Sequence, residues 1–172
     1  SGDKYIVVTN LMGVLRYLPD PKLYKDKIME IVKNNDIDRD NFISCLFDLG
    51  YEKVPVVSRT GEMAIRGYVV DIATNDKIGI RIEFWGDTID SIKYFDLENQ
   101  ISSKEIDSIK IFPYTEFLID KSFDDTIIRK QKYLPNYSSL VSGLWDYMKD
   151  FVLCYYDYNQ IMSSYNLLRE NI

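Results

Sequence analysis

The residues most able to do chemistry in this chain alternate along the stretch IGIRIEFWGD, residues 78–87. At the two-residue period of a β-strand, Arg81, Glu83 and Trp85 share one face, while three isoleucines and a phenylalanine take the other. The apolar set is sufficient to cover a core. The other set combines charged side chains with a tryptophan, which is the composition of a protein-binding hot spot.

Arg66 and Tyr68 extend this pattern into the preceding segment. The alternation over residues 63–73 predicts one strand in which Arg66 and Tyr68 share a face. If that strand forms a hairpin with the next one through residues 74–77, Arg66 and Arg81 lie within a few strand spacings of each other. The pattern leaves two alternatives open: Trp85 covers a second small core, or the Arg–Glu row forms only weak cross-strand ion pairs.

Catalytic, metal and cofactor chemistry finds little support in the sequence. The chain has no histidine, which removes the usual general base and the commonest metal ligand. Its glycines do not have the spacing of a phosphate-binding or dinucleotide-binding loop. Cys45 and Cys154 stand alone inside apolar runs, and we expect both to be buried free thiols. We therefore expect no catalytic residue, no metal and no cofactor.

Composition and charge restrict the partners further. With 46% hydrophobic and 14% aromatic residues the chain is that of a globular protein. The net charge of −6 argues against direct binding of DNA through its phosphates. Because no apolar run reaches the roughly 18 residues of a membrane span, we expect no membrane association and a cytoplasmic location.

Two ends of the chain predict pieces of an α/β domain. Residues 5–8 read as a wholly apolar strand, followed by a helix capped at Thr9 or Asn10. Residues 151–156 read as a second such strand, followed by a helix over 157–171. Continuous apolar strands that lead into helices are typical of a parallel sheet covered on both faces. A further helix is expected over residues 122–134.

The middle of the chain predicts a different architecture. A helix begins at Asp38 and ends at Gly50, and short alternating strands follow as far as Pro113. The expected fold class is α/β, in the mixed α+β sense: an antiparallel β-rich module with a packed helix, inserted in a partial α/β domain. The module covers residues 28–114, and the α/β domain consists of residues 1–27 and 115–172.

Three stretches of this module carry a resemblance to a known family. LGYEKVPVVSRTGEMAIRGYVVDI, IRIEFWGDTIDSIKYFDLENQ and IDSIKIFPYTEF resemble the N-terminal region of bacterial transcription-repair coupling factors, the Mfd proteins. That region is itself similar to the excision-repair protein UvrB. The form GEMAIRG and the opening VTNLMGVLRYLP are closer to the coupling factors than to UvrB.

The resemblance implies a role in nucleotide excision repair. In this family the inserted module binds UvrA, the damage-recognition ATPase subunit, and so recruits it to stalled transcription complexes. The implied UvrA-binding residues are Arg66, Arg81 and Trp85, with Tyr68 and Glu83 beside them. The family usually has phenylalanine where this chain has Trp85, which keeps a large apolar anchor.

The resemblance also bears on the rest of the protein. The outer α/β domain resembles a decayed, P-loop-like helicase domain, and its acidic motif is broken after Asp157, so we expect no ATP hydrolysis by this chain. The parent protein is expected to be an ATP-dependent DNA translocase of which this chain is a fragment, and its own C-terminal part is a second candidate partner. Two alternatives remain: a UvrB-like fragment that handles DNA, and a purely structural domain in which Trp85 is buried.

Overall fold

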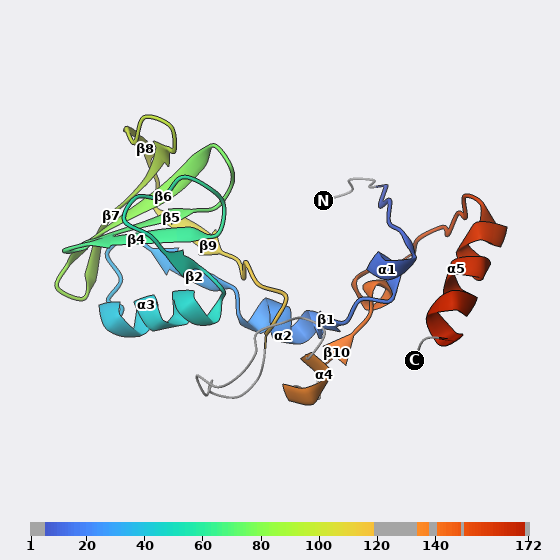
Figure 1. Cartoon of the computed structure of the whole chain (residues 1–172). Coiled ribbons are helices and arrows are strands. Elements are labelled where there is room, and N and C mark those ends of the chain that lie inside the picture. The colour runs from blue at the N-terminus through green and yellow to red at the C-terminus, as the bar shows by residue number, and fades with distance from the viewer. Residues whose placement is uncertain (1–5, 119–133, 138–140, 149, 171–172) are drawn as a thin grey trace. The chain divides into compact units, whose positions relative to one another are not determined.

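The computed structural model describes residues 6–118, 134–137, 141–148 and 150–170, and its residues fall into two units (Figure 1). One unit is Lys22–Leu118, and the other combines Ser1–Pro21 with Ile119–Ile172. The mixed α+β fold class is confirmed. Among the described residues, no helix has the length and apolar character needed to cross a membrane.

The unit Lys22–Leu118 is built on a six-stranded sheet in the order β3-β4-β5-β6-β7-β8. Its strands are β3 Glu52–Lys53, β4 Glu62–Arg66, β5 Val69–Ala73, β6 Ile78–Trp85, β7 Thr88–Asp96 and β8 Ser102–Glu105. From β4 to β8 each strand pairs antiparallel with the next, as the meander predicts. β3 differs from that prediction, because it lies parallel to β4.

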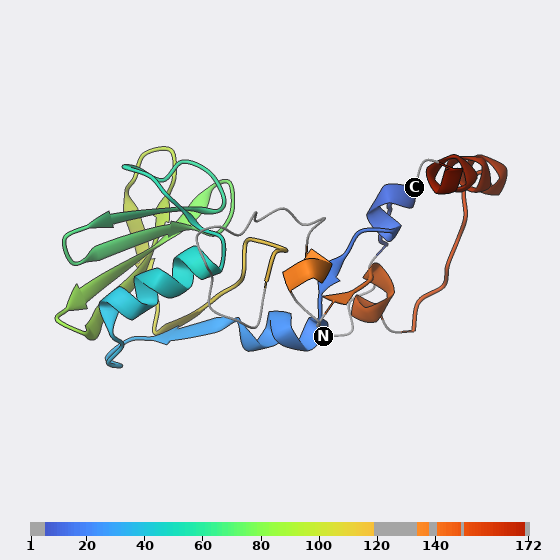
Figure 2. The same ribbon diagram turned by 60° about the horizontal axis from the view of Figure 1, so that its bottom comes forward.

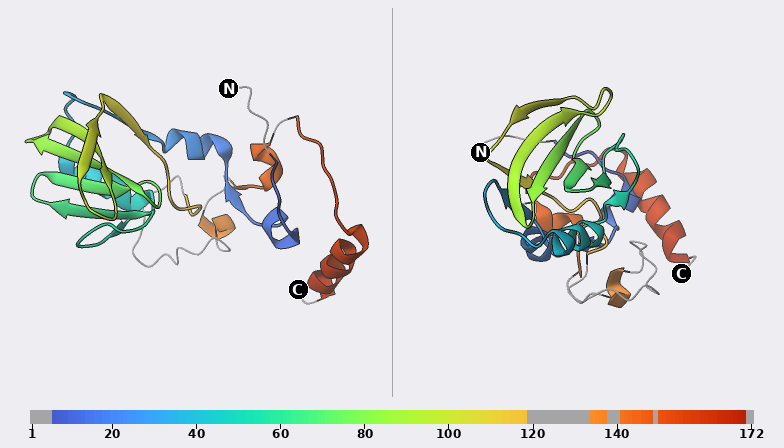
Figure 3. Two further views of the ribbon diagram at one scale, coloured as in Figure 1. Left: turned by 90° about the horizontal axis from the view of Figure 1, so that it is seen from above. Right: turned by 90° about the vertical axis from the view of Figure 1, so that its left-hand side faces the viewer.

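Helix α3 (Arg39–Asp48) covers one face of this sheet, as Figures 2 and 3 show. The side chain of Asp38 caps its first turn by accepting a hydrogen bond from the backbone N–H of Asn41 at 2.7 Å. Gly50 follows the helix at φ +91°, the left-handed exit that the sequence predicts. Phe42 and Leu46 of the helix are fully buried in the main core, and these apolar side chains fix α3 on the sheet.

The alternation along β6 is confirmed from Ile80 onward, whereas Ile78 at the start of the strand is exposed. Ile80, Ile82 and Phe84 point into the main core beneath α3. The opposite face carries a smaller apolar cluster at one end only, formed by five buried residues: Val57, Ala64, Ala73, Phe95 and Leu97. This is the second small core that the sequence allowed, and Trp85 is not part of it.

The prediction of a single strand over residues 63–73 is wrong. The chain reverses at Gly67 and Tyr68, so that β4 and β5 form a hairpin with Arg66 opposite Val69. Arg66 therefore ends one strand while Tyr68 lies in the turn, and the two do not share a strand face. Little in the sequence indicated this turn, because the apolar and polar residues keep alternating on both sides of it and Gly67 is the one turn-forming residue there.

This unit also contains a separate two-stranded sheet. Its strands are β2 (Met29–Val32) and β9 (Ser108–Ile111), which pair antiparallel with Met29 opposite Ile111. The short helix α2 (Pro21–Asp26) precedes β2. Ile31 of β2 is buried in the main core, which attaches this small sheet to the rest of the unit.

The other unit contains short elements. They are α1 Leu11–Val14, β1 Leu18–Pro19, α4 Leu134–Tyr137, β10 Val141–Ser142, the 3-10 helix η2 Leu144–Tyr147 and α5 Tyr158–Glu170. The expected cap of α1 is confirmed, since the side chain of Asn10 accepts from the N–H of Gly13 at 2.9 Å. Helix α5 also lies where the sequence predicts it. The helix expected over residues 122–134 lies almost wholly outside the described residues.

Both apolar strands predicted for this unit are wrong. Residues 6–8 and 151–156 have no strand pairing, and their side chains are exposed. An apolar run becomes a buried strand only when neighbouring strands satisfy its backbone, and the described residues supply none for these two runs. For the same reason Cys154 is exposed and not buried, while Cys45 is partly buried; both are free thiols.

Candidate protein interface

Arg66 and Arg81 both bind the buried carboxylate of Asp71. This group lies on the face of the six-stranded sheet opposite α3, which we call the open face. Asp71 on β5 lies directly opposite Arg81 on β6, and its side chain is completely buried. Arg81 donates from Nε to Oδ1 of Asp71 at 2.8 Å and from Nη2 to Oδ2 at 3.0 Å. Arg66 at the end of β4 donates from Nη2 to the same Oδ2. The sequence therefore predicted the proximity of the two arginines correctly but missed the aspartate that joins them.

The guanidinium of Arg81 is held on several sides. Its Nη1 donates to the Oγ of Ser102 at 2.9 Å and to the backbone oxygen of Gln100 at 3.4 Å. Its charge lies over the ring of Phe95, 4.7 Å from the ring centre. The hydrogen bonds to Asp71 raise the pKa of Arg81 above its ordinary value. The Arg81 side chain is only 16% exposed.

Glu83 is also bonded within the sheet. Its Oε2 accepts from the Nζ of Lys93 at 2.8 Å and from the Oγ of Ser91 at 2.5 Å, both on β7. These hydrogen bonds lower the pKa of Glu83. The alternative of cross-strand ion pairing is thus right for Glu83, although its partner is a lysine and not one of the arginines.

Trp85 and Tyr68 lie at the same end of the sheet and point to solvent. The backbone N–H of Phe84 donates to the backbone oxygen of Tyr68 at 2.9 Å, which places the β4–β5 turn against the end of β6. Trp85 is 83% exposed, and Tyr68 is exposed as well. A tryptophan with so little contact in its own chain contradicts the structural alternative, in which Trp85 was expected to be buried.

The five residues predicted for the site thus fall into two groups. Arg81 and Glu83 are largely bonded within the sheet, while Arg66, Tyr68 and Trp85 are exposed beside them. Asp71 was overlooked, although an aspartate in the apolar run VVDIA was a usable signal, because a buried carboxylate requires a cation close by.

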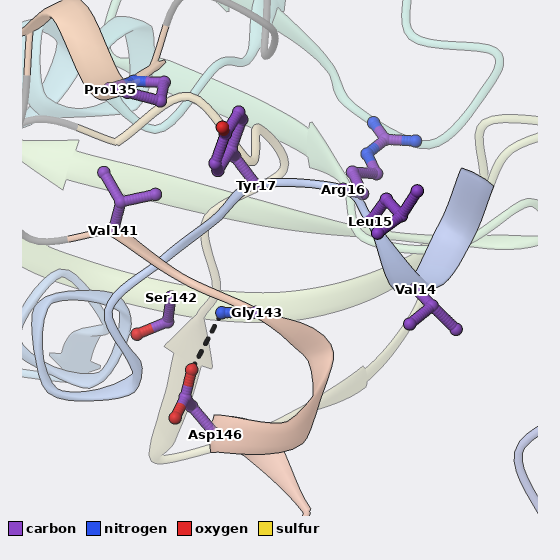
Figure 4. A pocket seen from close by; sticks show the side chains of 9 residues that line it. All are labelled: Val14, Leu15, Arg16, Tyr17, Pro135, Val141, Ser142, Gly143 and Asp146. Atoms are coloured by element: carbon purple, nitrogen blue, oxygen red, sulfur yellow. Dashed lines mark hydrogen bonds between the residues drawn. The ribbon is translucent and has the colours of Figure 1, made fainter. Parts of the chain in front are cut away.

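A hollow of about 320 Å³ in the other unit offers little chemistry (Figure 4). Its lining mixes apolar and polar residues: Val14, Leu15, Arg16, Tyr17, Pro135, Val141, Ser142, Gly143 and Asp146. The carboxylate of Asp146 already accepts from the N–H of Gly143 at 2.8 Å. Within the described ranges there is no group of three or more His, Cys, Asp or Glu residues able to hold a metal ion.

Comparison with known proteins identifies the unit that carries this face. Residues 29–117, just over half of the chain, match the family model of the UvrB interaction domain. The chain belongs to the UvrB interaction domain family. The match spans β2 to β9 and therefore includes both sheets, α3 and every residue of the Arg66–Asp71–Arg81 group.

Curated relatives of this UvrB interaction domain are transcription-repair-coupling factors. The protein of Staphylococcus epidermidis is 34% identical over 119 residues, which are 69% of this chain and 10% of that protein. The protein of Staphylococcus haemolyticus is 33% identical over 131 residues, 76% of this chain and 11% of that protein. A relative from Staphylococcus aureus is 33% identical over 119 residues. The chain spans about a tenth of the length of the curated relatives it matches.

Proposed function

We propose that this chain is a non-catalytic docking module of a transcription-repair coupling factor and that it binds UvrA. The proposed contact surface is the open sheet face around Arg66, Tyr68 and Trp85, with Arg81 and Glu83 behind them. Recruitment of UvrA to a stalled transcription complex would then lead into nucleotide excision repair, in the bacterial cytoplasm.

The observation that carries this proposal is the exposure of Trp85 in a UvrB interaction domain. A large aromatic side chain loses apolar hydration only if something else covers it, so an exposed tryptophan is a typical interface anchor. The charged group beside it, two guanidinium groups on one carboxylate, leaves one net positive charge, and its exposed part is Arg66. An apolar anchor next to a fixed charge gives both affinity and orientation.

The longer protein extends the proposal. We propose that the parent is an ATP-dependent DNA translocase, that the outer unit belongs to a degenerate helicase-like domain, and that the protein's own C-terminal part competes for the same face. Support comes from the coupling-factor relatives, which are about ten times the length of the matched segment.

The test is a calorimetric titration of the chain into purified UvrA from the organism that encodes it. We expect saturable binding by the wild type and its loss in an Arg66→Ala/Trp85→Ala variant whose circular dichroism and melting curve match the wild type. Undiminished binding by the folded variant, or no binding by the wild type, would defeat the proposal.

A further inference from the structure

We propose that Asp71 is the positioning residue of this interface: it fixes Arg66 for the partner, and Arg81 serves mainly to hold Asp71. The inference rests on the proposed function, since it assigns separate tasks to residues of the same face. Arg66 is then the arginine that meets the partner, while Arg81 acts from behind it.

The first step is the state of Asp71. Its carboxylate is buried, and its two oxygens accept three hydrogen bonds from two guanidinium groups. A buried carboxylate with these partners has a single low-energy position, because any rotation leaves an unpaired charge away from water. Asp71 is therefore a fixed point in the middle of the sheet.

The second step is the contrast between the arginines. Arg81 makes four hydrogen bonds within the unit, lies over Phe95 and is 16% exposed, so little of it remains for a partner. The side chain of Arg66 is 45% exposed, and its bond to Asp71 is the one it makes among the described residues. Its remaining N–H groups are available to an acceptor on the partner, such as a carboxylate or a backbone oxygen.

The third step is the effect on binding. A free arginine on a sheet surface samples many rotamers and loses them when a partner binds. Arg66 has lost part of this freedom already, because one end of its guanidinium is tied to Asp71. Holding the side chain in advance reduces the entropic cost of association, which is the general advantage of a preorganised contact.

Asp71→Asn separates positioning from simple charge. The substitution keeps the size of the side chain and raises the net charge of the face by one. If Arg66 acted only through charge, the variant would bind UvrA as tightly as the wild type or more tightly. If Asp71 positions Arg66, binding to purified UvrA weakens by about five- to tenfold despite the added positive charge.

A double-mutant cycle tests whether Asp71 acts through Arg66. We expect Asp71→Asn to cause no further loss of affinity in an Arg66→Ala background, since the residue that it positions is gone. An equal loss in both backgrounds, or wild-type affinity in Asp71→Asn alone, would overturn the inference.

A second variant covers the case in which Asp71→Asn does not fold. Arg66→Lys keeps the charge at an exposed site, but an ammonium bonded to Asp71 has no planar fork left to reach a partner. We expect its affinity to be close to that of Arg66→Ala, and wild-type affinity would contradict the positioning role.

Trp85→Ala separates the two proposals. If Trp85→Ala loses affinity while Asp71→Asn and Arg66→Lys do not, the docking face is right and the role of Asp71 is wrong. If the wild type itself does not bind UvrA, the proposed function fails, and the positioning role fails with it.

Discussion

Replacing Trp85 by alanine is the sharpest test of the docking face, because the structure fixes its effect on both binding and stability. An aromatic side chain buries roughly 150–250 Å² when it is fully covered. Since 83% of Trp85 is exposed in the free chain, most of that area is available to a partner. At about 25 cal/mol per Å², covering roughly 200 Å² contributes at most about 5 kcal/mol.

Ordering at the interface and the area that alanine still buries reduce this figure. We expect a loss of about 2–3 kcal/mol in binding free energy, in the range of an interface hot spot. Such a loss raises the dissociation constant by about 30- to 150-fold. The free energy of unfolding should change by less than about 0.5 kcal/mol, because the side chain has few contacts within the chain.

Calorimetric titration into UvrA measures the first quantity, and urea unfolding measures the second. Phe112→Ala is the matched control, since Phe112 is an exposed aromatic residue directly after β9, outside the six-stranded sheet, and should leave the affinity unchanged. A Trp85→Ala chain with wild-type stability and wild-type affinity would refute the argument. A large loss of stability would instead show that Trp85 is packed against its own chain.

Three further predictions concern the sheet that supports this face. Arg81→Ala should lower the free energy of unfolding by roughly 2–4 kcal/mol, because it removes two of the three hydrogen bonds to the buried carboxylate of Asp71. Urea unfolding measures this loss, and a loss below about 0.5 kcal/mol would contradict the role of Arg81 as the main partner of Asp71. Gly79→Ala should cost roughly 1–3 kcal/mol in the same assay, since a Cβ there would lie 2.4 Å from the ring of Phe95, and an unchanged midpoint would argue against that contact. Burial, and secondarily the neighbouring Tyr24, raises the pKa of Tyr51 from about 10 to about 12. Between these pH values the folded chain keeps a proton that the unfolded chain loses, so the free energy of unfolding should fall as the pH rises. A Tyr51→Phe chain, compared in urea at pH 8 and about pH 11, should show a smaller fall than the wild type, and an equal fall would assign the effect to other groups.

The sequence predicted best those elements whose structure is decided by residues close together in the chain. The alternation along β6 and the Asp38 cap of α3 are each determined by residues close together in the chain, and each was correct. A strand with one buried face leaves a period of two in its sequence whatever the rest of the protein does.

The errors arose where the outcome depends on distant residues. The runs at residues 6–8 and 151–156 have the composition of buried strands, yet composition cannot supply the neighbouring strands that would pair with them. The division of the arginines into one exposed and one bonded residue depends on the register between β5 and β6, which brings Asp71 opposite Arg81. Sequence alternation gave Arg66 and Arg81 the same environment, whereas the sheet gives them different ones.

The pairing of β2 with β9 has a consequence for how this segment joins the rest of the chain. Met29 and Ile111 lie opposite each other in an antiparallel ladder, so the chain enters and leaves at neighbouring points roughly 5 Å apart. The remaining chain on either side therefore has to bridge only about one strand spacing, and closing such a short gap costs little loop entropy. Because Met29 and Ile111 are joined by the ladder of β2 and β9, the two ends of this segment hold each other in place without help from the residues that precede or follow it.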